Sequence, residues 1–323
     1  MKTTQRRIAL LTGASISALG VSALGLASPA IAAPHDGLAG PTTVAGTSTT
    51  SSPITICDIA ATNPCFYGVY NTGSGLVAAT VNAVANGQIY QHGTTDTVSL
   101  SLTNAAGSSA EVGAVASATG AAAQTATARN IAIEQYAHAS VGNAANAVNN
   151  DGTLIVDAVA FASSTGGAAN AVATNGGGVW QYAYATGTGV ASAKNSFTNN
   201  GTYSAAATAT AKATGAAVAS ASQNYGLYQY ASNNGTGVAS NNVTNAGTLN
   251  IAANANATGS AADAHATNYY GLEQTAYADE GDASNTVNNS GTLNITAIAK
   301  ANASAGAATA YATEYSALQQ YAS

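Results

Sequence analysis

The sequence predicts an all-β fold, a β-solenoid (parallel β-helix) built from about six imperfect repeats of 44–48 residues. Three observations lead to this prediction. A glutamine recurs at nearly constant spacing, an Asn-x-Gly motif recurs between the glutamines, and the segments between these markers alternate with a period of two residues. Repeats of about 20–50 residues are typical of solenoids, propellers and arrays, and a period of two is typical of strands with one buried face.

The first 32 residues have the pattern of a secretory signal peptide. Three basic residues within the first seven precede a mostly apolar stretch over residues 8–26, and Ala30-Ile31-Ala32 then provides a small-residue cleavage site. We therefore expect an exported protein at the cell surface, in association with the outer membrane, or outside the cell. The sequence has no other long apolar run, so we expect no transmembrane helix in the mature chain.

Two short segments are expected between the signal peptide and the repeats. Residues 33–53 are rich in Gly, Thr, Ser and Pro, which is typical of a flexible linker. Residues 54–70 are expected to form an N-terminal cap that contains both cysteines, Cys57 and Cys65. Because exported proteins meet an oxidising compartment, we expect a disulfide between them that closes this end of the fold. The solenoid repeats are then expected over residues 71–323.

The recurring glutamine marks one position in each repeat. Its six copies, spaced by 44, 46, 48, 45 and 46 residues, are Gln91, Gln135, Gln181, Gln229, Gln274 and Gln320. An aliphatic residue stands two residues before each copy and a small residue stands two residues after it. We expect these glutamines to point inward and to stack, because a buried amide is costly alone, whereas a column of amides satisfies itself.

The second marker is a turn motif. It occurs as Asn150-Asp151-Gly152, Asn199-Asn200-Gly201, Asn245-Ala246-Gly247 and Asn289-Ser290-Gly291, with Asn104-Ala105-Ala106-Gly107 as a weaker earlier copy. Asn and Gly tolerate positive φ, so we expect turns here.

The inward positions between the markers are mostly alanine, as in the alternating run from Leu293 to Ala305. Alanine favours helix, but no helical apolar face with i, i+3 and i+4 spacing is present. Small inward residues favour a thin, flat coil in which two sheets approach closely. Whether each repeat forms one large coil or two small ones stays open.

Charge and composition narrow the function. Without the signal peptide, four basic residues stand against 13 acidic ones, a net charge of −9. Nucleic acid and anionic membranes need basic patches, so we expect neither as a partner. The acids that precede the marker glutamine, Glu134 and Glu273, are separated by copies with Trp180 and Tyr228. We therefore expect no enzymatic activity, catalytic residue, metal site or cofactor.

Tyrosine follows the marker glutamine in four repeats, as Tyr136, Tyr182, Tyr230 and Tyr321. The alternation places these rings on the outer face, where they form a possible contact surface for sugar rings or a partner protein. The alternative is that they cover the neighbouring coil and protect the ladder.

The Asn-x-Gly-Thr turns and Ala-rich alternating strands resemble the β-helical passenger regions of autotransporter and haemagglutinin-like adhesins over about residues 70–323. Separately, Ile89-Tyr90-Gln91-His92-Gly93 and Leu227-Tyr228-Gln229-Tyr230 resemble the core of curlin repeats, which are about half as long and carry a second glutamine. Both resemblances imply an extracellular structural protein in adhesion, biofilm or surface attachment. They leave a curlin-like amyloid subunit and a β-helix polysaccharide lyase or hydrolase as alternatives. The expected partners are a surface anchor protein, a polysaccharide or other copies of the chain.

Overall fold

The computed structural model describes residues 49–56, 65–75 and 78–323, and in these ranges the regular structure consists of β-strands only. The strands pair in parallel, which confirms the predicted all-β, parallel solenoid-like architecture. Within the same ranges, no helix has the length and apolar character needed to cross a membrane. The predicted signal peptide, most of the predicted linker and Cys57 lie outside the described residues.

The strands form three sheets, named here I, II and III. Sheet I contains β1 (Thr49–Ile56), β4 (Thr97–Asn104), β7 (Ala144–Asn150), β11 (Ala193–Asn199), β14 (Ala239–Asn245) and β17 (Ala283–Asn289). Sheet II contains β2 (Cys65–Gly75), β5 (Ser109–Gly120), β8 (Thr153–Ser164), β12 (Thr202–Ala213), β15 (Thr248–Gly259) and β18 (Thr292–Ala303). Sheet III contains β3 (Ala79–Thr95), β6 (Gln124–Ala139), β9 (Ala169–Asn175), β10 (Val179–Ala185), β13 (Ala216–Asn233), β16 (Ala261–Ala278) and β19 (Ala308–Ala322).

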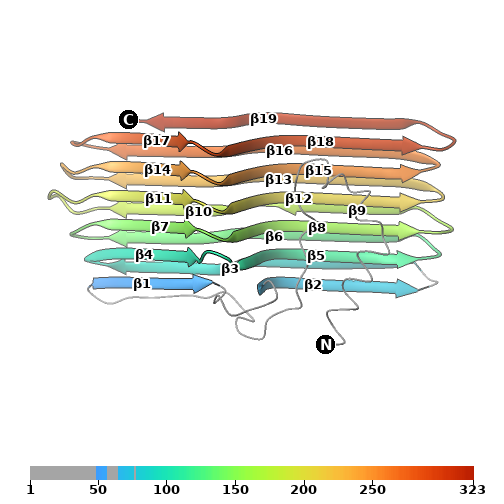
Figure 1. Ribbon diagram of the computed structural model, residues 1–323, viewed down its shortest axis with the longest axis horizontal. Helices are drawn as coiled ribbons and strands as arrows, with labels where there is room; N and C mark the ends of the chain where they lie inside the picture. Colours follow the sequence, from blue (N-terminus) through green and yellow to red (C-terminus); the bar gives the residue numbers. More distant parts are fainter. Residues whose placement is uncertain (1–48, 57–64, 76–77) are drawn as a thin grey trace.

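Each circuit of the chain passes through sheets I, II and III in turn. Sheets I and II lie next to each other on one side, and the long strands of sheet III run behind both (Figure 1). Side chains paired across neighbouring strands lie from 44 residues apart, as in Asn245 with Asn289, to 49 residues apart, as in Asn150 with Asn199. One sequence repeat therefore makes one large circuit, which answers the question that the sequence left open.

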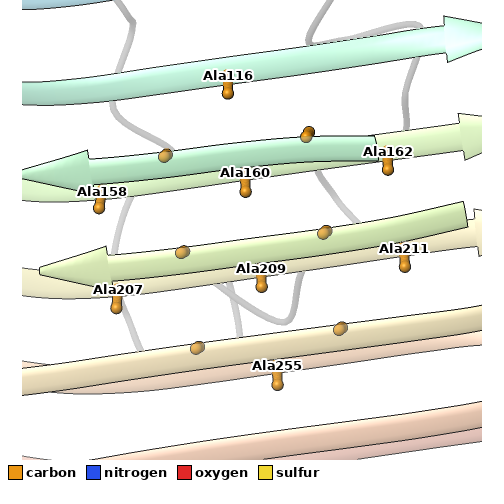
Figure 2. Packing of buried hydrophobic residues seen from close by; sticks show 14 of the residues in the cluster. Ala116, Ala158, Ala160, Ala162, Ala207, Ala209, Ala211 and Ala255 are labelled. Carbon is orange, nitrogen blue, oxygen red and sulfur yellow. The ribbon is translucent and has the colours of Figure 1, made fainter. Parts of the chain in front are cut away.

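The core between sheets II and III is made almost entirely of alanine. Figure 2 shows these methyl groups along neighbouring strands, where Ala160, Ala209 and Ala255 occupy equivalent positions of β8, β12 and β15. The facing alanines of sheet III include Ala128, Ala173, Ala219 and Ala264. All are buried. Because no side chain longer than a methyl group separates most of this interface, the two sheets can approach closely, as the sequence predicted.

Larger apolar side chains fill the region where the three sheets meet. They include Ile133, Val148, Leu154 and Leu272. In one circuit Tyr203 takes the place of the leucine and Ala205 follows two residues later, whereas the next circuit has Leu249 and Ile251. Ala205 is much smaller than Ile251, whereas Tyr203 is larger than Leu249 and Phe197 stands where the next circuit has Val243, so larger and smaller side chains offset one another in a close-packed core.

The Asn-x-Gly turns join sheet I to sheet II and stack on one another. A Cβ added at Gly201 would collide with the backbone oxygen of Gly152, and one at Gly247 with that of Gly201. Among the described glycines, only Gly107 has a positive φ, of 78°. The chain turns from sheet I to sheet II at the four strong copies of the motif, as expected, without a positive φ at their glycines. Glycine is needed there because successive turns pack backbone against backbone.

Candidate functional site

The six marker glutamines lie in register along sheet III and form a column of amides. From Gln135 onward, each Nε2 donates to the Oε1 of the glutamine in the preceding circuit, at 2.7 Å from Gln135 to Gln91 and 2.8 Å from Gln181 to Gln135. The same bond continues through Gln229, Gln274 and Gln320 at 2.6–2.7 Å. All but Gln320 are fully buried.

The glutamine amides also bridge the core. The Nε2 of Gln135 donates to the backbone oxygen of Ala147 at 2.9 Å, and the Nε2 of Gln181 donates to that of Ser196 at 2.9 Å. Both acceptors belong to sheet I. Each of these two side-chain amides thus links one circuit to the next and links sheet III to sheet I. Both N–H bonds of each amide therefore have an acceptor although the side chain is buried.

Two asparagine columns run parallel to the glutamine column. One consists of the turn residues Asn104, Asn150, Asn199, Asn245 and Asn289, joined by Nδ2-to-Oδ1 bonds of 2.7 Å. The other consists of Asn146, Asn195, Asn241 and Asn285, joined at 2.8–2.9 Å. Sequence reasoning missed the second column, although its members stand four residues before the turn asparagine in each copy.

The predicted contact tyrosines Tyr136, Tyr182 and Tyr230 lie side by side on the outer face of sheet III, paired in register on β6, β10 and β13. The fourth, Tyr321, aligns with Thr275 of β16. A second outward position, two residues further along each strand, contributes Tyr184 and Tyr277. Sequence reasoning missed this second position because only some copies carry an aromatic residue there.

The two positions, together with Tyr90 two residues before His92, form a continuous zigzag of aromatic contacts, named here the aromatic stripe. It runs through Tyr90, His92, Tyr136, Tyr184, Tyr230, Tyr277 and Tyr321, with successive ring centroids 5.0–5.9 Å apart. The stripe crosses β3, β6, β10, β13, β16 and β19. Where β16 has Thr275 at the first position, Tyr277 at the second carries the contact from Tyr230 on to Tyr321.

Rings of the stripe are tilted against one another. Their interplanar angles lie between 37° and 67°. Elsewhere on sheet III, Tyr269 and Tyr315 stack with an interplanar angle of 6° and His265 and Tyr311 with 21°. A stacked pair covers one face of each ring with the other ring, whereas tilted rings leave part of each face open to a ligand.

A branch leaves the stripe at Tyr136, whose ring centroid lies 6.3 Å from that of Tyr182, and extends toward the middle of sheet III. Tyr182 contacts Tyr228, which contacts Tyr225, and Tyr225 packs edge-on against Trp180 at 6.0 Å. The indole of Trp180 lies against Gly177, where a Cβ would collide with it. Of the three glycines between β9 and β10, Gly177 therefore makes room for the only tryptophan of the chain.

Two carboxylates sit among these rings. Burial raises the pKa of Glu134, and burial also raises the pKa of Glu273. Burial and, to a smaller extent, the nearby charge of Glu134 raise the pKa of Tyr90. Burial, followed by the charge of Glu273, raises the pKa of Tyr228 to about 12. Glu134 and Glu273 therefore ionise less readily than exposed carboxyl groups, and Tyr90 and Tyr228 less readily than exposed phenols.

A second acidic pair lies on sheet II. Gly113 aligns with Asp157 on the neighbouring strand and Glu111 aligns with Ile155, so the two acids are diagonal neighbours. Both are buried, and burial raises the pKa of Asp157 to about 7. Repeat alignment does not reveal this pair, because the two acids are offset by two residues from strict register. Within the described ranges, no group of three or more His, Cys, Asp or Glu side chains is placed to hold a metal ion.

Fold and surface together define a parallel β-solenoid with internal amide columns and an aromatic outer face. No protein-family model, curated protein or solved structure matches the chain. Cys65 is the first residue of β2, while its predicted disulfide partner Cys57 lies outside the described residues.

Proposed function

We propose that this chain is an exported structural protein of the bacterial cell surface or extracellular matrix, built from about six repeats, that acts in adhesion, biofilm formation or surface attachment. The observation that supports it best is the unbroken aromatic stripe on a fold whose circuits are bonded to one another by amide columns. A rigid body with a long aromatic face suits contact with a large, extended partner. A polysaccharide, a surface anchor protein or further copies of the chain are its proposed partners, and no enzymatic reaction is assigned to it.

Deleting the gene in the source organism tests this proposal. We expect the deletion to reduce attachment to surfaces or biofilm mass, and re-expression of the full chain to restore it. Fractionation of the wild-type culture should place the protein with the cell surface or the matrix. Unchanged attachment and biofilm in the deletion strain would refute the proposal.

A second candidate, a curlin-like functional amyloid subunit, is favoured by one observation, the glutamine column. Amide columns on parallel strands also stabilise cross-β fibrils. Incubating the purified mature chain at micromolar concentration distinguishes the two. Fibrils that grow with time and diffract at about 4.7 Å and 10 Å support the amyloid subunit, whereas discrete monomeric rods support the solenoid scaffold.

A further inference from the structure

We propose that the aromatic stripe binds a neutral, extended, β-linked polysaccharide, with one glycan chain lying along the solenoid axis. This inference rests on the proposed function, because it names the chemical class of the partner that the scaffold contacts. Its support comes from the spacing, the tilt and the charge of the stripe.

The spacing of the rings suits one sugar per circuit. Neighbouring strands are about 4.8 Å apart, and the stripe supplies at least one aromatic ring on each strand that it crosses. A pyranose in an extended β-1,4-linked chain is slightly longer than one strand spacing. A glycan along the axis therefore meets a ring at nearly every sugar, whereas one laid across the strands meets only two outward aromatic positions per circuit.

The tilt of the rings leaves suitable surface. Sugars contact aromatic rings through their C–H-bearing faces, so they need ring faces rather than ring edges. Successive rings of the stripe are tilted by 37–67°, so none is covered by a parallel neighbour within the zigzag. Tyr277 and Tyr321 at the C-terminal end are 39% and 50% exposed, so their rings are accessible.

The charge of the stripe favours a neutral glycan over an acidic one. The stripe contains no Lys or Arg, and the carboxylates of Glu134 and Glu273 lie near its rings or those of its branch. Lys194, Lys212 and Lys300 belong to strands of sheets I and II. Arg129 is on β6, five residues before Glu134, roughly 16 Å away along the strand. A uronic acid polymer would bring like charge to the carboxylates with no cation to balance it.

Binding of two oligosaccharides of equal length to the purified mature chain tests the proposal. Cellohexaose represents the neutral β-linked class and hexagalacturonate the acidic class, and calorimetry measures both affinities. The stripe variant Tyr184→Leu/Tyr230→Leu removes two adjacent rings at the centre of the zigzag. The control Tyr269→Leu/Tyr315→Leu removes two stacked rings from the same sheet outside the stripe. Circular dichroism and thermal melting establish that both variants fold.

We expect the wild-type chain and the control to bind cellohexaose alike, and the stripe variant to bind it at least about tenfold more weakly, as expected for the loss of two aromatic contacts. We expect hexagalacturonate to bind more weakly than cellohexaose at pH 7. Equal binding of cellohexaose by the stripe variant and the wild type, preferred binding of hexagalacturonate, or no binding of either would overturn the inference. The binding measurements do not depend on the deletion strain. If the deletion reduces attachment but the purified chain binds neither oligosaccharide, the proposed structural function stands and only the proposal of a glycan ligand is refuted.

Discussion

The hydroxyl of Tyr203 donates a hydrogen bond to the backbone oxygen of Gly226, 2.7 Å away across the core. Tyr203 is fully buried and packs edge-on against Phe197, with ring centroids 5.0 Å apart. A Cβ at Gly178, which lies between β10 and the preceding β9, would collide with this hydroxyl. Gly178 therefore makes room for the Tyr203 hydroxyl, and the carbonyl oxygen of Gly226 accepts its hydrogen bond.

The first prediction concerns this bond. Tyr203→Phe removes the buried donor but keeps the ring, so we expect the free energy of unfolding to fall by about 1–2 kcal/mol. Urea unfolding followed by circular dichroism measures it. Tyr269→Phe, which changes a partly exposed tyrosine outside the core, is the control and should have little effect. Equal stability of Tyr203→Phe and the wild type would show that the hydroxyl contributes nothing.

The second prediction concerns the glutamine column. Gln229→Leu removes the acceptor of the Gln274 amide and the donor to Gln181, so two buried polar groups lose a partner. We expect a loss of about 2–5 kcal/mol in the free energy of unfolding. Gln320→Leu, at the end of the described column, disturbs one neighbour and should cost less. If both substitutions cost the same, the column does not act through its internal hydrogen bonds.

The third prediction concerns the alanine core. Ala209 is 1% exposed and lies between equivalent alanines of the circuits before and after it. Ala209→Val adds bulk to the alanine-lined interface between sheets II and III, and we expect it to destabilise the protein by about 1–3 kcal/mol. Ala307→Val at an exposed position is the matched control. An unchanged melting temperature of Ala209→Val would show that the interface between the two sheets accommodates a larger side chain.

The fourth prediction concerns pH. Burial raises the pKa of Glu134 and of Glu273 above the ordinary value of 4.5. The folded state then holds these protons more tightly than the unfolded state, so the resulting stability is present at low pH and is lost as pH rises through the folded-state pKa. We expect a higher melting temperature at pH 5 than at pH 7, and a smaller difference in Glu134→Gln/Glu273→Gln. The exposed Glu280→Gln should keep the wild-type difference.

The regular spacing of the markers made the parallel architecture predictable from sequence. When Gln135 and Gln181 stand in equivalent sequence surroundings, the simplest arrangement places them on neighbouring strands, and they are paired there. The presence of a third sheet and the interruption between β9 and β10 were not predictable. Both depend on how the turns bend the chain within one circuit, which the repeat spacing does not specify.

The aromatic stripe was only half predictable for a related reason. A period of two identifies Tyr136 and Tyr184 as outward residues, but it does not reveal that contacts cross diagonally from one outward position to the other. The proximity of Glu111 and Asp157 was not predictable for the same reason, because the two acids are offset by two residues from strict register. Diagonal neighbours on a sheet follow from three-dimensional pairing rather than from repeat alignment.

The direction of the backbone hydrogen bonds has a mechanical consequence. In all three sheets these bonds join one circuit to the next and so run along the solenoid axis. A pull along the axis loads the bonds between two circuits in tension and peels the circuits apart in succession. A pull along the strands loads every bond of a strand in shear at the same moment, which resists far larger forces. The solenoid is thus mechanically anisotropic, stiff against drag across its axis and able to yield circuit by circuit along it.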